Sequence, residues 1–206
     1  GATWTDTLEG NGTVDGNGTV NVNAPGAYLL SYDVNDASGN AAEQVTRMVT
    51  VVDSTKPVIT LNGDANVTHE AATAYLDGGA TWTDTLDGNG ALVAAGAVDV
   101  NVLGVYVLTY DFTDAAGNAA VSVTRIVSVA DTTKPVISLA GDANVTHEAA
   151  TAYLDGGATW TDTLEGNGTV DGNGTVNVDL PGAYVLSYDV ADVGGNAATQ
   201  VVRAVT

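Results

Sequence analysis

The chain has 206 residues, which is enough for one large domain or for two or three small ones. Its 25 acidic and 5 basic side chains give a net charge of −20, which excludes nucleic acid and anionic membrane surfaces as partners. The absence of cysteine excludes a disulfide framework and thiol chemistry, and no apolar run approaches the roughly 18 residues that a membrane-spanning helix needs.

From the N-terminus onward, the sequence consists of copies with a period of 78 residues. The period relates Trp4 to Trp82 and Trp160, and residues 1–22 recur unchanged as residues 157–178. Self-similarity at a fixed period indicates structurally equivalent modules placed head to tail.

The recurring Asp-Ser/Thr-Thr-Lys-Pro segment divides the copies and predicts three modules. They are a partial repeat at residues 1–53 that lacks its first strands, a complete repeat at 54–131 and a third repeat at 132–206. We expect the partial repeat to result from a fragment boundary at Gly1. The alternative is that strands donated from elsewhere complete it.

Within the complete repeat, apolar patterns of period two between Gly-rich and Asn-rich breakers predict six short strands. In chain order they are Pro57–Leu61, Asn66–Glu70, Tyr75–Asp84, Ala97–Val102, Val105–Phe112 and Ala120–Val129. The breakers Asp87–Gly90 and Ala115–Asn118 carry the residue types that turns with positive φ need. No segment has the 3.6-residue period of a helix, so the pattern predicts an all-β sandwich of two sheets.

The run Glu9–Gly18 and its twin at residues 165–174 contain Asn-Gly twice. No acidic residue closes a 12-residue loop, so the run does not match an EF-hand. Paired hairpin turns are the favoured interpretation, because Asn-Gly suits the turn type that matches strand twist.

Three sequence segments carry a resemblance to a known family: Thr-Lys-Pro-Val-Ile at 55–59, Pro-Gly-Ala-Tyr at 181–184 and Asp-Val-Gly-Gly-Asn at 192–196. With these segments the chain resembles bacterial immunoglobulin-like surface repeats related to hyalin repeats, over essentially its whole length. The resemblance implies tandem immunoglobulin-like β-sandwiches in a head-to-tail rod, outside the cell on the bacterial surface. It also implies a tyrosine corner in each copy, at Tyr28, Tyr106 and Tyr184.

Acidic residues concentrate where a linker and two turns of each sandwich are expected to converge. The expected groups are Asp53, Asp84, Asp87, Asp111 and Asp114 for the second repeat, and Asp131, Asp162, Glu165, Asp189 and Asp192 for the third, with Glu70 facing the third group from the preceding repeat. Neighbouring carboxylates repel each other unless some are protonated or a cation neutralises them. Calcium accepts irregular sites of six to eight oxygens, so the sequence predicts Ca²⁺ at the module junctions. The alternative is that these acids are solvated and cap their own turns.

Catalytic motifs are not recognisable in the sequence. His69-Glu70 falls short of His-Glu-x-x-His because the second histidine is missing, and no nucleophile elbow, phosphate loop or dinucleotide fingerprint occurs. We therefore expect no enzymatic activity.

Two further residue types need an explanation. Trp82 shares strand parity with Ala80, which favours a core position over an exposed platform for sugar. Arg125 has the parity of an apolar row, as do its counterparts Arg47 and Arg203, so a bulge or an acidic partner is required.

These observations together predict structural spacer or stalk modules of a large secreted or surface-anchored bacterial protein of the adhesin type. Neighbouring modules of the same chain are the expected partners, and calcium at their junctions is expected to stiffen the array. The alternatives are a carbohydrate-binding module that contacts surface glycans, an accessory module of a secreted enzyme, and a subunit of a self-assembling extracellular fibre.

Overall fold

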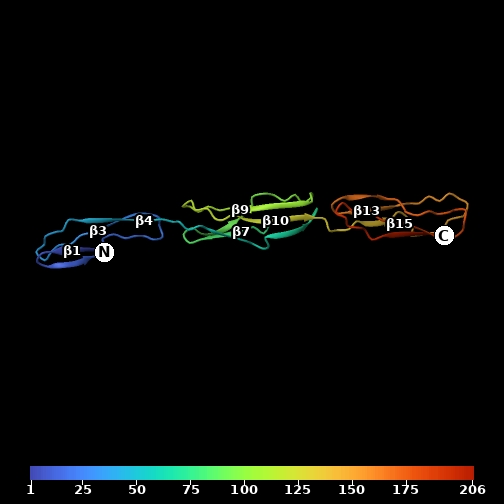
Figure 1. Cartoon of the computed structure of the whole chain (residues 1–206). Coiled ribbons are helices and arrows are strands. Elements are labelled where there is room, and N and C mark those ends of the chain that lie inside the picture. Colours follow the sequence, from blue (N-terminus) through green and yellow to red (C-terminus); the bar gives the residue numbers. More distant parts are fainter. The chain divides into compact units, whose positions relative to one another are not determined.

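The computed structural model describes all 206 residues and consists of strands and loops without a helix (Figure 1). The strands are β1 (Ala2–Asp6), β2 (Gly10–Val14), β3 (Gly26–Tyr32), β4 (Val45–Val51), β5 (Val58–Leu61), β6 (Asn66–Glu70), β7 (Ala80–Asp84), β8 (Gly88–Leu92), β9 (Gly104–Tyr110), β10 (Val123–Ala130), β11 (Val136–Leu139), β12 (Asn144–Val145), β13 (Ala158–Asp162), β14 (Gly166–Val170), β15 (Tyr184–Tyr188) and β16 (Val201–Val205). No element is a helix long and apolar enough to cross a membrane.

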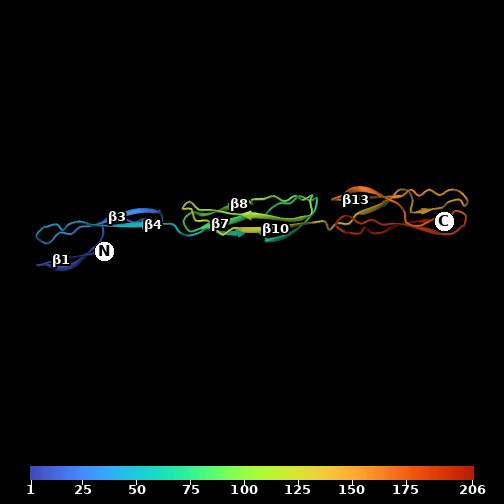
Figure 2. The ribbon, with the colours of Figure 1, turned by 45° about the horizontal axis from the view of Figure 1, so that its top comes forward.

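Each complete repeat contains two sheets of three strands. Their orders are β5-β7-β8 and β6-β10-β9 in the second repeat, and β11-β13-β14 and β12-β16-β15 in the third. The first repeat has only the pairs β1-β2 and β3-β4. Within each repeat the strands run along a common direction (Figure 2), and β6 and β12 pair in parallel with β10 and β16. The predicted all-β class is confirmed.

Two compact units can be distinguished in the chain. The first comprises residues 1–59, 82–90 and 111–121, and the second comprises the remaining residues. The predicted division into modules at residues 1–53, 54–131 and 132–206 stays a prediction.

Alternate strand positions build a small core in each sandwich. In β9, Leu108 and Tyr110 are buried whereas Val105 and Val107 are exposed, which confirms the predicted alternation. In the third repeat, the buried cluster is Ile137, Ala158, Leu186 and Tyr188, and Trp160 packs against it.

The sequence-based prediction was partly wrong for residues 87–102 of the second repeat. We predicted a turn at residues 87–90, but Gly88–Leu92 forms β8, and the predicted strand at 97–102 is a loop. The physical reason is Trp82, because a Cβ at Gly90 would lie 2.6 Å from its Nε1 atom. Glycine is needed here so that the indole can lie across the neighbouring strand, and not for positive φ.

The same correction applies to the run Glu9–Gly18. Its first half is strand β2, in which Gly12 pairs with Trp4, so it is not the first of two hairpin turns. Positive φ occurs at Gly10 (+91°), where the turn between β1 and β2 ends, and at Gly18 (+117°), next to the bridge between Asn17 and Ser31.

The arginine in the apolar row has an acidic partner. Arg125 is 2% exposed and forms an ion pair with Asp77, while its Nη1 also donates to the Tyr110 hydroxyl at 3.1 Å and its Nε to the Asp64 carbonyl at 2.9 Å. Burial acts to raise the pKa of Asp77, but hydrogen bonds from Tyr110 and Arg125 outweigh it and hold that pKa below its ordinary value. Burial and the Asp77 carboxylate raise the pKa of Tyr110 to about 12.

The predicted tyrosine corners are confirmed. The hydroxyls of Tyr28, Tyr106 and Tyr184 each donate to a backbone carbonyl four residues upstream, at 2.7, 2.8 and 2.6 Å. Leu103, which replaces a proline of the other copies, leaves the corner at Tyr106 intact.

Candidate metal centre

Acidic side chains from three segments gather at one end of each complete repeat. The segments are the linker that enters the repeat, the turn after its first hairpin strand, and the loop after β9 or β15. The second-repeat carboxylates are Asp53, Asp84, Asp87 and Asp114, and the third-repeat carboxylates are Asp131, Asp162, Glu165 and Asp192.

Ligand atoms converge most closely among the third-repeat carboxylates. One carboxylate oxygen each of Asp131, Glu165 and Asp192 lies within 4.8 Å of the other two. Asp131 and Asp192 are buried, at 7% and 8% exposure. A metal ion placed among them would be partly shielded from water.

Four buried carboxylate oxygens of the two groups have no hydrogen-bond partner. They are the Oδ2 atoms of Asp53, Asp84, Asp131 and Asp162. A buried polar atom without a partner costs about 1–3 kcal/mol, and more when it is charged. A bound cation would remove this cost.

The opposite oxygens of the same aspartates are occupied by their own turns. Oδ1 of Asp84 accepts hydrogen bonds from the backbone amides of Leu86 and Asp87 at 2.8 and 3.0 Å. Oδ1 of Asp131 accepts one from the Thr133 hydroxyl at 3.1 Å. The alternative prediction, in which these acids cap their own turns, therefore describes Oδ1 and leaves Oδ2 unexplained.

Sequence reasoning missed the asparagine that ties the linker to the repeat. Nδ2 of Asn196 donates to the Asp131 carbonyl and to Oδ2 of Asp192, both at 3.0 Å. Asn118 makes the same two bonds, to Asp53 at 3.3 Å and Asp114 at 2.8 Å. The recurring Asp-x-x-Gly-Asn pattern was the available signal, but it was assigned to a turn.

The electrostatics of the site favour a cation. Burial raises the pKa of Asp131, and the negative charges of Asp192 and Asp162 raise it further. Neither group of carboxylates forms an ion pair with Lys or Arg, since the ion pairs of the chain are those of Arg125 and Arg203. The donors are all hard oxygens, so the residues present fit calcium better than a softer metal.

Three of the predicted ligands do not join these groups. Asp111 and Asp189 are exposed, and the Asp189 carboxylate accepts hydrogen bonds from Gln200 at 2.8 and 3.0 Å. Glu70 contacts the linker instead, because its Oε1 accepts from the amides of Thr132 and Thr133 at 3.0 and 3.2 Å. Hydrogen bonds from Thr132 lower the pKa of Glu70.

No free aromatic platform is present at the tryptophan of the second repeat. Trp82 is half-buried, and its ring stacks on Phe112 with 3.9 Å between centroids and 16° between planes. Its face is therefore already occupied by a side chain of the same repeat.

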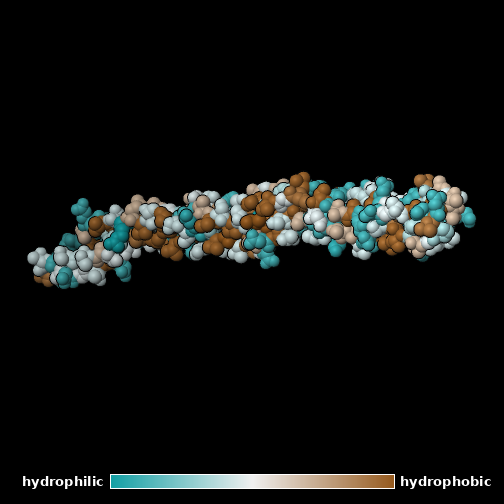
Figure 3. Space-filling view, turned by 45° about the vertical axis from the view of Figure 1, so that its right-hand side comes forward, coloured by the Kyte–Doolittle hydropathy of each residue, from teal (hydrophilic) through white to brown (hydrophobic).

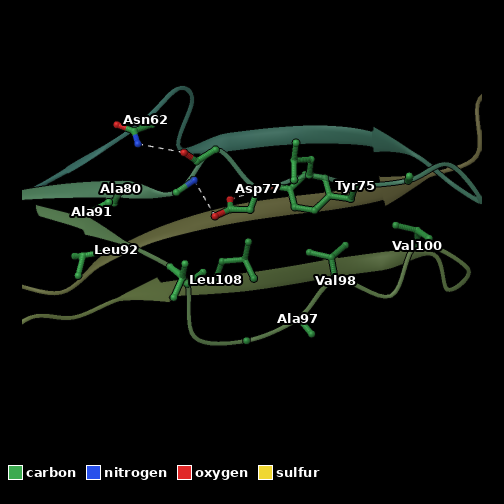
Figure 4. Close-up of a pocket in the computed structure, with 17 residues that line it drawn as sticks. Asn62, Tyr75, Asp77, Ala80, Ala91, Leu92, Ala97, Val98, Val100 and Leu108 are labelled. Atoms are coloured by element: carbon green, nitrogen blue, oxygen red, sulfur yellow. Dashed lines mark hydrogen bonds between the residues drawn. The ribbon is translucent and has the colours of Figure 1, made fainter.

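The second repeat also contains an open groove of about 720 Å³ (Figure 4). Its walls are mostly apolar and include Leu92, Val98 and Leu108, whereas its one charged residue, Asp77, forms an ion pair with Arg125. The counterpart beside Tyr153 has about 410 Å³. The groove offers no free charged group for chemistry.

Exposed apolar residues also occur elsewhere on the surface, interleaved with hydrophilic ones on the face seen in Figure 3.

The chain is distantly similar to several solved structures, including the following two. The lipoprotein BT2262 from Bacteroides thetaiotaomicron is 17% identical over 71% of this chain and 99% of its own, with a TM-score of 0.32. The M60 catalytic domain with the CBM51-1 and CBM51-2 domains of Clostridium perfringens ZmpB is 15% identical over 94% of this chain and 27% of its own, with a TM-score of 0.30. Both scores are too low to transfer a fold or a function.

Sequence comparison is more informative. No curated protein matches the chain. The family described as bacterial surface protein, Ig-like domain, matches residues 1–51, 59–129 and 137–206, once for each repeat. The chain therefore belongs to the family of Ig-like domains of bacterial surface proteins.

Proposed function

We propose that the repeats are spacer modules of a large secreted or surface-anchored bacterial protein of the adhesin type, and that Ca²⁺ bound by the junction carboxylates stiffens them. The observation that carries this proposal is the buried Asp131. Its Oδ2 has no hydrogen-bond partner, and one of its carboxylate oxygens lies within 4.8 Å of oxygens of Glu165 and Asp192. Such an atom is stabilised by a cation that shares its pocket.

The linker into the third repeat is held from two directions. Glu70 at the end of β6 accepts hydrogen bonds from Thr132 and Thr133, and Asn196 donates to the carbonyl of Asp131. Calcium would add a third attachment, because Asp131 belongs to the linker while Glu165 and Asp192 belong to the repeat. A linker fixed in this way transmits force without bending.

Calcium binding at the site needs no rearrangement of the turns. The turns already hold Oδ1 of Asp84 and its counterparts, which leaves the Oδ2 atoms as ligands. Water and backbone carbonyls would complete a shell of about 6 to 8 oxygens.

The proposal assigns no catalytic role to the repeats. The strongly perturbed groups outside the junctions, Asp77, Tyr110 and Arg125, satisfy one another inside the sandwich. A sugar-binding role has less support, since Phe112 covers the Trp82 ring. No specific contact within the chain supports the alternatives of a fibre subunit or an accessory module of an enzyme.

Calcium titration of the whole chain tests the proposal. We expect heat of binding by calorimetry, and a small-angle scattering profile that changes when calcium is removed by a chelator. Asp131→Asn should abolish binding at the third repeat, whereas Asp189→Asn, which lies outside the group, should leave it unchanged. A scattering profile that is the same before and after complete chelation would contradict the stiffening role.

A further inference from the structure

We propose that the two junctions bind calcium with unequal affinity, and that two differences between otherwise similar loops set the order. The third-repeat site fills first and the second-repeat site fills at higher calcium concentration. This inference rests on the proposed function, because it concerns the regulation of the same sites. Its consequence is an array that stiffens in steps as calcium rises.

The first difference is the reach of one acidic side chain. Glu165 accepts a hydrogen bond from the Val193 amide and still brings an oxygen within 4.8 Å of Asp131 and Asp192. Asp87 occupies the corresponding position but is one methylene shorter. Its Oδ2 accepts from the Ala115 amide at 2.7 Å. No group of three ligand atoms within the same distance forms in the second repeat.

The second difference is the space beneath the linker. A Cβ at Gly194 would lie 2.9 Å from the carbonyl oxygen of Asp131 and 3.2 Å from its Cβ. The second repeat has Ala116 at this position, so its linker cannot approach as closely. Gly194 is thus a positioning residue that lets the linker dock.

Two observations on the linker agree with this reasoning. The bond from the asparagine to the linker carbonyl is 3.0 Å for Asn196 and 3.3 Å for Asn118. Asp131 is 7% exposed, whereas Asp53 is only half-buried. The linker carboxylate is therefore better desolvated in the third repeat, and it faces a more complete ligand set.

Burial and ligand convergence act in the same direction on affinity. A rigid site with more charged ligands binds Ca²⁺ more tightly than a looser site with fewer. The unpartnered oxygens of Asp53 and Asp84 indicate that the second repeat retains part of the site. The shorter side chain of Asp87 and the more distant linker weaken calcium binding in the second repeat without abolishing it.

Calorimetric titration of single-site chains with CaCl₂ measures the two affinities separately. Asp53→Asn in the whole chain leaves the third-repeat site, and Asp131→Asn leaves the second-repeat site. We expect the third-repeat site to have a dissociation constant lower by about tenfold or more, a difference of about 1.4 kcal/mol.

Reciprocal exchange of the two loop residues identifies the cause. Asp87→Glu with Ala116→Gly, in the chain that keeps the second-repeat site, should tighten binding toward the value of the third. Glu165→Asp with Gly194→Ala, in the other chain, should weaken it by a similar factor. Circular dichroism establishes that each variant is folded, and the gain of affinity in the second repeat does not depend on a destabilising change.

The outcomes separate this inference from the proposed function. Equal dissociation constants in the two single-site chains would overturn the inference and leave calcium binding intact. Unequal constants that the exchanges do not move would overturn the roles of residues 87, 116, 165 and 194. Absence of binding in both chains and in the unmodified chain would overturn the proposed function itself.

Discussion

The first and third repeats share an unchanged segment, residues 1–22 and 157–178, yet the segment lies in different surroundings. In the third repeat, Arg203 is 2% exposed and forms an ion pair with Asp155. In the first repeat, the corresponding Arg47 is exposed, and its guanidinium carbon lies over the Tyr32 ring, 5.7 Å from the centroid.

This difference shows what the segment from Lys134 to Gly156 contributes. It supplies β11 and β12, which each add a third strand to a sheet, and it supplies the aspartate that compensates the buried arginine. An identical strand sequence is thus only a part of the core, and its partner strands decide how deeply it is buried.

The largest expected effect comes from removing the acidic partner in the third repeat. Asp155→Ala leaves Arg203 buried without its counter-charge, which typically destabilises a protein by about 3–5 kcal/mol. Amide hydrogen exchange at Tyr188 and Val205 measures this locally. Arg47→Ala serves as the control and should change stability by less than about 0.5 kcal/mol. Equal effects of the two substitutions would remove the distinction between the repeats.

A smaller effect is expected at alkaline pH. The pKa of Tyr188 is raised to about 12 by burial and by the Asp155 carboxylate, above the ordinary value of 10.0. Because the folded-state pKa is the higher one, the stabilisation is complete below pH 10 and is lost as the pH rises toward 12. Two units correspond to at most about 2–3 kcal/mol.

Tyrosinate absorbance combined with denaturant unfolding measures the alkaline effect. Tyr188→Phe should remove the part of the alkaline stability loss that comes from the third repeat. Tyr32→Phe makes the same substitution in the first repeat, where the partner aspartate is missing. Loss of stability that begins well below pH 10 would contradict the assignment.

The smallest of the three effects concerns the tryptophan and its glycine. A Cβ at Gly168 would lie 2.7 Å from Nε1 of Trp160, so Gly168→Ala should cost about 1–3 kcal/mol through overpacking. Gly12→Ala introduces the same clash with Trp4, but no third strand holds that ring, so we expect a lower cost. Hydrogen exchange of each hairpin tests this ranking, and a higher cost at Gly12 would reverse it.

The sequence predicted part of the candidate site but not all of it. The convergence of Asp131, Glu165 and Asp192 was predicted, because linker and turns follow from the direction of successive strands. The roles of Asn196 and Gly194 were not predicted, since they depend on how closely the linker approaches the loop. The hydrogen bond from Gln200 to Asp189 was not predicted either, because no local pattern in the sequence indicates it.

The sequence by itself determined the all-β class, the three-fold repetition, the tyrosine corners and the position of the acidic turns. The all-β class and the acidic turns follow from strand alternation and turn residues, which act over a few neighbours. The repetition follows from the 78-residue period, and the tyrosine corners were implied by the resemblance to bacterial immunoglobulin-like surface repeats. Only the tertiary structure decided that Asp77 compensates Arg125, that glycine at position 90 serves Trp82, and which carboxylate oxygens are left without a partner. Burial and hydrogen-bond partnership are properties of segments brought together from far apart in the chain, so no local pattern encodes them.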